Sequence, residues 1–359
     1  MNIGAHALAN NIFAAPMAGV TDRPFRRLCK ALGAGYAVSE MVTSRRDLWH
    51  TLKTSRRANH DGEAAPIAVQ IAGTDAAMMA DAAAYNIERG AHIIDINMGC
   101  PAKKVCGKWA GSALMRDEPL ALQIIDAVVA ACAPHGVPVT LKMRTGWAQG
   151  HKNALSIARA AENAGVQMVT VHGRTREQGY KGLAEYDTVA EVKAALRIPV
   201  VANGDIDSPE KARDVLAYTG ADAIMVGRAA QGRPWIFREI AHFLKTGTHL
   251  APPLVAEAKR LMIDHLLDHY ALYGEFSGVR TARKHIGWYV NSLPGGEEFR
   301  ARMNLLDGSD AQVRAVEEFF GGMGERFDRI PAASTPGPDA PPVDGIDDGR
   351  DRNEETNTA

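Results

Sequence analysis

The sequence predicts an α/β protein in which a (β/α)8 TIM barrel is followed by a small C-terminal all-α domain. Three observations lead to this fold class. Eight short apolar segments alternate with helix-like segments over the first 244 residues, glycine and proline alternate at the junctions, and only helical patterns follow Leu250. Eight β/α units in about 240 residues match the size of a barrel. A doubly wound open sheet is the alternative, because it has the same alternation.

The eight predicted strands are rich in valine and isoleucine. Most are continuous apolar runs, as expected for parallel strands covered on both faces. They are Ile12–Met17, Tyr36–Met41, Ile67–Ile71, Ile93–Asn97, Val139–Met143, Met168–His172, Val200–Asn203 and Ala223–Val226. Segments such as Asp75–Arg89, Pro119–Cys132 and Asn153–Asn163 lie between them and have helical periodicity.

Glycine and proline mark the strand entrances in turn. A glycine accepts the left-handed conformation common just past a helix C-terminus, and a proline is tolerated at the first residue of a strand. Every second strand follows such a glycine: Gly33, Gly90, Gly165 and Gly220. Three of the others are entered through Pro66, Pro138 and Pro199. This alternation predicts four βαβα units in tandem.

We expect three regions: a catalytic barrel at residues 1–244, a helical domain at 245–330 and a tail at 331–359. The predicted helices of the second region are Leu254–Leu272, Val279–Leu293, one within Glu297–Leu306, and one from near Asp310 to Phe320. The tail is rich in proline, glycine and aspartate and nearly lacks large apolar residues. It cannot bury enough surface to offset its ordering entropy, so disorder is predicted.

The net charge of −1 hides an uneven distribution. Seven acidic residues and two arginines give the tail −5, which leaves +4 on residues 1–330. No apolar run reaches the roughly 20 residues of a membrane span, and no signal peptide is visible. The four cysteines form no CxxC pair, which predicts a cytoplasmic protein with reduced thiols. His265 and His269 share a helix face, but HExxH is absent, so no metal is expected.

Polar residues stand where the predicted strands end, which is where barrels carry their active sites. Gln70, Asn97, Lys142, His172 and Asn203 should therefore converge on one mouth. Phosphoanions in barrels often bind after strands seven and eight, where this chain has Gly204, Gly227 and Arg228. These residues predict a phosphorylated ligand with a flat polar ring. Asp95, inside strand four, is either a base or a buried charge with a partner such as Lys142.

Three motifs resemble those of the dihydrouridine synthases, flavin barrels that reduce uridine in tRNA. They are Ala15–Asp22 (APMAGVTD), Asn97–Pro101 (NMGCP) with Lys103 and Lys104, and Asn203–Ile206 (NGDI). The resemblance covers roughly residues 10–320. Leu141–Trp147 and Val171–Thr175 look like the bacterial B subfamily, which is also linked to nitrogen-regulation operons.

The resemblance implies bound FMN, with NADPH or NADH as reductant. Cys100 would be the general acid that gives a proton to C5 of uracil while the flavin gives a hydride to C6. The implied cofactor residues are Pro16, Met17 and Ala18 along the flavin ring, Gln70 and Lys142 at its pyrimidine edge, His172 at the flavin or the uracil carbonyls, and Asn203, Gly204, Asp205, Gly227 and Arg228 at the phosphate.

Basic clusters beside the predicted mouth suggest contacts with tRNA phosphates, although any one of them could be a solvated surface. We expect the substrate contacts to come from Asn97, Lys103, Arg144, Arg174, Arg176, Arg283 and Lys284. The helical domain would bind tRNA, the target uridine must turn outward, and a monomer is expected. Two alternatives stay open. One is an FMN barrel oxidoreductase acting on a free small molecule of dihydroorotate or enoate type, and the other is a non-catalytic RNA-binding or regulatory protein.

Overall fold

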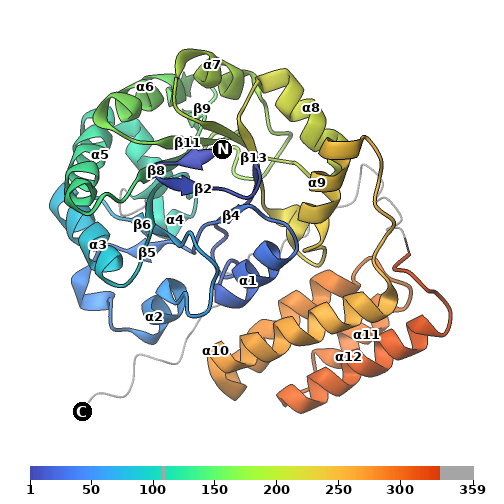
Figure 1. The fold of residues 1–359 in the computed structure, drawn as a ribbon. Helices are drawn as coiled ribbons and strands as arrows, with labels where there is room; N and C mark the ends of the chain where they lie inside the picture. Colours follow the sequence, from blue (N-terminus) through green and yellow to red (C-terminus); the bar gives the residue numbers. More distant parts are fainter. Residues whose placement is uncertain (107–109, 332–359) are drawn as a thin grey trace, which may run out of the picture.

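The computed structural model describes residues 1–106 and 110–331, apart from the side chains of Lys103 and Lys104. Its main feature is one curled parallel sheet surrounded by helices (Figure 1). The strands are β3 (Ile12–Ala14), β4 (Tyr36–Ala37), β5 (Val42–Thr43), β6 (Ala68–Ala72), β7 (Ile93–Met98), β8 (Val139–Arg144), β11 (Met168–His172), β12 (Val200–Asn203) and β13 (Ala223–Val226). Seven of the eight predicted strands appear as single strands at the expected places.

The second predicted strand, Tyr36–Met41, is divided in the structure. Its first part, β4, pairs with β3, whereas β5 begins one residue after the predicted end and pairs with β6. Between them Val38 bridges to Ala68, and the Ser39 hydroxyl accepts the Gln70 N–H at 3.0 Å. A side chain thus replaces part of the regular ladder. The sheet order β4-β3-β13-β12-β11-β8-β7-β6-β5 closes through this segment, which confirms the (β/α)8 barrel.

The outer helices begin and end at residues suited to those positions. Asp22 accepts the Phe25 N–H and caps α1, Asp75 caps α3, and Ser208 caps α8. All four predicted helix-terminating glycines have positive φ, from 65° at Gly220 to 105° at Gly165. The outer helices are α1 (Arg23–Ala31), α2 (Leu52–Ala58), α3 (Ala76–Glu88), α5 (Glu118–Cys132), α6 (Ala154–Ala164), α7 (Asp187–Ala195), α8 (Pro209–Thr219) and α9 (Ile236–Thr246).

Shorter elements complete the barrel. The N-terminal hairpin of β1 (Asn2–Ile3) and β2 (His6–Ala7) carries Ile3, which packs with Phe13, Tyr36 and Met168 in the interior apolar cluster. The sequence analysis did not predict this hairpin. The loops contain β9 (Gly146–Ala148), β10 (His151–Lys152), α4 (Lys103–Cys106) and the 3-10 turns η1 (Arg46–Leu48), η2 (Gly111–Arg116), η3 (Ala133–His135) and η4 (Arg228–Ala230).

The helical region consists of α10 (Val255–Val290), α11 (Gly296–Met303) and α12 (Ser309–Gly324), beside the barrel in Figure 1. The two predicted helices 254–272 and 279–293 are the arms of α10, which is interrupted at Gly274 (φ 75°, ψ 168°). Leu28 of α1 and Leu32, which follows this helix, belong to the apolar core of this region, so the region is anchored on the barrel. None of the described helices is long and apolar enough to cross a membrane. The predicted disordered tail lies, from residue 332, outside the described residues.

Candidate active site at the mouth of the barrel

The strand register brings the predicted polar residues to one end of the barrel. Gln70 of β6 lies across from Asp95 of β7, and Asn97 of β7 lies across from Lys142 of β8. On the other side of the ring, His172 of β11 is level with Asn203 of β12. Because all these strands are parallel, their carboxyl ends meet at one edge. The expected convergence is therefore observed.

A chain of buried amides starts at Asp95. The Asp95 carboxylate accepts the Thr140 hydroxyl at 2.6 Å and the Gln70 amide at 2.7 Å, and Asn97 donates to the Gln70 carbonyl at 2.6 Å. Burial raises the pKa of the Asp95 carboxyl, and these two hydrogen bonds partly offset that rise. Asp95 is thus a buried anchor that fixes the orientation of Gln70. Its hydrogen-bond partners are Gln70 and Thr140. Lys142, its expected partner, instead hydrogen-bonds to Asn203 and acts on Asp95 through its charge, which lowers the pKa of Asp95.

Lys142 is held by Asn203. Its ammonium donates to the Asn203 side-chain carbonyl at 2.9 Å, and the Asn203 amide donates to the Met225 carbonyl at 2.8 Å. Burial, followed by repulsion from Arg144, lowers the pKa of Lys142 to about 8. A cation that is costly to keep charged is well suited to meet an incoming negative charge.

The segments that follow β11, β12 and β13 form an arginine–carboxylate cluster. Arg174 binds both oxygens of Asp205, at 2.8 and 2.6 Å, and Arg228 binds one of them at 3.0 Å. These contacts outweigh burial and lower the pKa of Asp205. Because this carboxylate is anionic and already bound by two arginines, its side chain does not suit the phosphate role expected for it. Arg228 is half exposed and remains suitable.

Position 204 has no room for a side chain, which explains its glycine. Its φ is 125°, and a Cβ atom there would lie 2.8 Å from the Ala184 Cβ and 3.1 Å from the His172 Cδ2. The glycine thus lets Ala184 and His172 pack against the buried main chain at the end of β12. Burial, together with Arg144 and Lys142, lowers the pKa of His172 well below its ordinary value, so the imidazole is neutral at physiological pH.

Cys100 lies in a loop that is fixed on both sides. Its N–H donates to the Asn97 side chain at 3.1 Å, and its carbonyl accepts the Ser112 hydroxyl at 2.8 Å and the Cys106 thiol at 3.4 Å. Burial raises the pKa of the Cys100 thiol. The thiol is therefore protonated at neutral pH, as a proton donor must be.

The first loop of the mouth follows β3 and contains Pro16, Met17 and Ala18. Its shape is set by Thr21, whose hydroxyl bonds to the Met17 N–H at 2.8 Å and to the Ala15 carbonyl at 2.9 Å. Gly19, at φ 74°, donates to the Glu40 carboxylate at 2.6 Å, while its carbonyl accepts the Lys284 ammonium of α10. The helical region thus touches the loop expected to contact the flavin.

Two arginines that were expected to contact RNA are buried in the structure. The Arg144 and Arg174 side chains are almost wholly buried. Arg144 donates to the carbonyls of Gly99, Thr175 and Gly179 at 2.7–2.9 Å, so it fastens loops together instead of facing solvent. Arg174 is occupied by Asp205. Their charge and their positions after the fifth and sixth predicted strands suggested phosphate contacts, and the sequence carried no signal of burial.

The other expected substrate residues lie in different places. The Lys284 ammonium donates to the Gly19 carbonyl, and Arg283 donates to the Leu306 carbonyl and Asp307 at 3.1 Å. Neither side chain therefore points freely into the mouth. Arg176 lies over the Trp147 ring at 4.7 Å and is half-buried. The Lys103 side chain lies outside the described part of the structure.

Two residues at the mouth were missed by the sequence analysis. Glu40 is buried and holds Gly19, and its place near the end of the second predicted strand could have indicated it. Tyr180 is 42% exposed, and its ring centre lies 5.0 Å from the Arg228 guanidinium and 6.3 Å from the His172 ring. A partly exposed aromatic ring at this mouth offers a stacking surface.

Comparisons with known proteins identify one family. The dihydrouridine synthase (Dus) family model matches residues 13–321. The tRNA-dihydrouridine synthase B of Pseudomonas aeruginosa is 58% identical over 89% of this chain and 96% of its own length. The protein of the same name from Shewanella oneidensis is 57% identical over 89% and 98%.

Solved structures with lower identity share the fold. Morphinone reductase superposes with a TM-score of 0.51 at 13% identity, covering 70% of this chain and 90% of that one. Histamine dehydrogenase from Rhizobium sp. 4-9 superposes with a TM-score of 0.53 at 12% identity, covering 91% and 64%. The family match and the two close relatives establish that this chain belongs to the dihydrouridine synthase family.

Proposed function

We propose that this protein reduces the C5=C6 bond of specific uridines in tRNA to 5,6-dihydrouridine, with FMN as its bound cofactor. The observation that carries the proposal is the Cys100 thiol, protonated and fixed in a loop that shares Asn97 with the amide chain of the mouth. Family membership supports the reaction, since close relatives bear the name tRNA-dihydrouridine synthase B.

The mouth fits FMN in three respects. Gln70 has used one amide hydrogen and one lone pair, so it can offer one more of each to a flavin pyrimidine edge. Lys142 supplies a cation where a reduced flavin is negative. The half-exposed Arg228 suits a phosphate group. Pro16, Met17 and Ala18 would line the ring, while His172, Asn203 and Gly227 would complete the site.

Proton transfer is the task of Cys100. When bound, the flavin supplies the hydride that is added to C6 of the uracil. The Cys100 thiol then gives its proton to C5, and the thiolate must be reprotonated before the next turnover. The nearby cations Arg144 and Arg57 lower the pKa of the thiol slightly against the effect of burial, so they stabilise the thiolate that forms. We propose NADPH or NADH as the source of electrons.

A tRNA substrate explains features that a small molecule does not require. Arg45, Arg46 and Lys53 are exposed in the segment after β5, and Arg280 is exposed on α10. These cations would contact phosphates while the target uridine is turned out of the RNA. We also propose that the protein works as a monomer in the cytoplasm, where this substrate is found.

The test compares Cys100→Ala with Cys106→Ser. The purified protein should be yellow, and Cys100→Ala should retain FMN and its reduction by NADPH while losing about 10²–10⁴-fold in dihydrouridine formation. Cys106→Ser keeps a donor for the Cys100 carbonyl and should stay active. A colourless protein, or normal activity of Cys100→Ala, contradicts the proposal.

The free-molecule alternative has its own test. Nucleoside analysis of tRNA from a strain lacking the gene should reveal a missing dihydrouridine. Normal dihydrouridine in that strain, combined with rapid reduction of a free enone or oxidation of dihydroorotate by the purified protein, would favour the alternative.

A further inference from the structure

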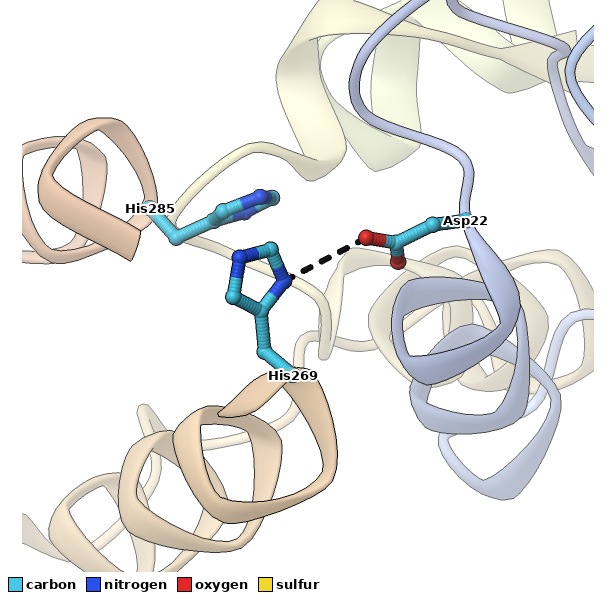
Figure 2. Close-up of side chains that lie close together, drawn as sticks. All are labelled: Asp22, His269 and His285. Carbon is cyan, nitrogen blue, oxygen red and sulfur yellow. Dashed lines mark ion pairs between the residues drawn. The ribbon is translucent and has the colours of Figure 1, made fainter. Parts of the chain in front are cut away.

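A buried cluster of one carboxylate and three imidazoles lies between the barrel and the helical region, and none of its four residues was given a role at the mouth. Asp22 stands just before α1, and His265, His269 and His285 belong to α10. All four are at most 4% exposed. Figure 2 shows His269 directed at the Asp22 carboxylate, with the His285 ring beside it.

The interruption of α10 at Gly274 creates this cluster. In a straight helix, residues 269 and 285 would be separated by about 24 Å along the axis. Their ring centres are instead 5.2 Å apart, because the two arms turn back on each other at Gly274. The backbone conformation at Gly274 (φ 75°) favours glycine, so the sequence provides for this close approach.

The hydrogen bonds of His269 fix its tautomer. Its Nε2 lies 2.8 Å from the Thr281 hydroxyl oxygen, and that hydroxyl donates to the Ser277 carbonyl at 2.7 Å. A threonine hydroxyl has one hydrogen, so Nε2 must be the donor to Thr281. Nδ1 then faces Asp22 Oδ2 at 3.3 Å, and the two acceptors repel unless a positive species stands between them.

A proton or a metal ion could be that species. A proton on His269 Nδ1 would satisfy His269 and Asp22 only. His285 Nε2 is also buried and has no hydrogen-bond partner among the described residues. One ring nitrogen of His285 lies within 4.8 Å of a ligand atom of each of the other two residues. One cation bound by all three would satisfy every one of these atoms, which a proton does not.

We propose that Asp22 Oδ2, His269 Nδ1 and His285 Nε2 bind one divalent first-row transition metal ion, with Zn²⁺ as the reference ion, and that this ion joins the helical region to the barrel. Two imidazoles and one carboxylate are an established ligand set for such ions, with a further position for water. Both ring nitrogens of His265 lack partners among the described residues. Its ring is 4.8 Å from that of His285, so His265 can bond to that water.

The geometry and charges are compatible with this ion. Bonds of about 2.0–2.2 Å place tetrahedral ligands about 3.3 Å apart, as Asp22 and His269 already are. The ligand atom of His285 lies up to 4.8 Å from the other two ligand atoms. Bringing it to the same spacing needs a movement of about 1.5 Å, which side-chain rotation can provide. Burial lowers the pKa of His285 well below its ordinary value, which keeps the imidazole neutral and able to bind metal. One acidic and one basic side chain, Glu40 and Lys284, also lie near Asp22.

The experiment measures metal in the full-length protein purified without chelators or metal-affinity resin. Elemental analysis before and after dialysis against Zn²⁺ should give about one ion per chain, and Co²⁺ should produce visible d–d absorption bands. His285→Gln should lower zinc affinity at least tenfold. His135→Gln, which changes an exposed histidine on η3, is the matched control and should bind like the wild type.

The wild type alone also tests the proposal, in case His285→Gln does not fold. Metal-free wild-type protein should gain several degrees in Tm when Zn²⁺ is added, since an ion that binds only the folded state stabilises it. The proposal is overturned if wild-type protein neither contains nor takes up a stoichiometric ion, or if a folded His285→Gln binds zinc as tightly as His135→Gln.

Discussion

The barrel mouth and the junction with the helical region are both buried polar networks, yet they differ in completeness. At the mouth, Gln70 and Asn203 each bond to two neighbours within the protein. At the junction, by contrast, His265 and His285 have ring nitrogens without partners in the described part of the chain. Buried polar groups left unsatisfied cost about 1–3 kcal/mol each.

This difference shows two ways of building a buried polar site. The mouth is preorganised by the protein itself, so a ligand finds its partners already in position. The junction is incomplete on its own, which is why it points to a bound species. The two networks meet at the segment from Met17 to Asp22, since Gly19 contacts Lys284 and Asp22 contacts His269. The predictions below test how far each network stabilises the fold.

The largest effect is expected at the buried arginine of the mouth. Arg174→Met removes two bonds to Asp205 and two to the carbonyls of Lys181 and Gly182. We expect a loss of about 3–5 kcal/mol in the free energy of unfolding, measured with urea. Arg228→Met is the matched control, because Arg228 pairs with the same carboxylate from a half-exposed position, where about 0–1 kcal/mol is expected. Equal losses would mean that burial is not the deciding factor.

A smaller effect is expected where the helical region touches the mouth. Lys284→Met removes a charged donor from the Gly19 carbonyl and should cost about 1.5–3 kcal/mol in unfolding free energy. FMN affinity should fall as well, because the Pro16–Ala18 loop loses a support. Arg283→Met, next to it on α10, loses an exposed pair with Asp307 and should cost under about 1 kcal/mol. Unchanged stability and FMN binding in Lys284→Met would show that the network at the mouth does not depend on the network at the junction.

Much of the barrel could be predicted from sequence because its signals are local. Apolar runs bounded by glycine and proline located β11, β12 and β13 at their observed bounds. The split of the second strand could not be predicted, because it depends on the Ser39 hydroxyl meeting Gln70 from another strand. The two helical arms of α10 were also predicted, but the way they fold back on each other at Gly274 was not.

The limits at the site have the same origin. Residue type placed Gln70, Lys142 and Asn203 at the mouth, since strand ends converge in any barrel. Residue type did not distinguish buried arginines such as Arg144 from exposed ones such as Arg280, because that depends on loops distant in sequence. For the same reason His265 and His269 could be paired on one helix face, whereas Asp22 and His285 could not be added to them.

A pH dependence is expected from Lys142, whose pKa is lowered to about 8 by burial. FMN binding favours the charged ammonium and raises this pKa. The affinity for FMN is therefore highest below pH 8 and falls as the pH rises above it. The FMN dissociation constant should increase up to about tenfold between pH 7 and pH 9. Fluorescence titration of flavin into apoprotein measures this. In Lys142→Arg the cation persists, and the increase should disappear; an identical rise in that variant would assign it to another group.

The smallest effect is expected on the surface of the helical region. Arg280 is exposed, and its guanidinium lies 3.9 Å from the centre of the Phe276 ring, which is itself 71% exposed. It stands one helical turn before Lys284, which contacts the mouth loop, so its charge lies close to the path of an RNA entering the mouth. Arg280→Ala removes one phosphate contact. It should weaken tRNA binding about two- to fivefold and reduce the slope of log K against log salt by about 0.9.

The control for Arg280→Ala is Lys245→Ala. Lys245 is equally exposed, but it lies in the last turn of α9. In a barrel the helices run back toward the N-terminal ends of the strands, so this cation is at the face opposite the mouth. Filter-binding titrations at several salt concentrations should therefore show a reduced slope for Arg280→Ala and an unchanged one for Lys245→Ala. If both variants lose the same slope, tRNA is attracted by overall charge, and the junction between the helical region and the mouth does not guide it.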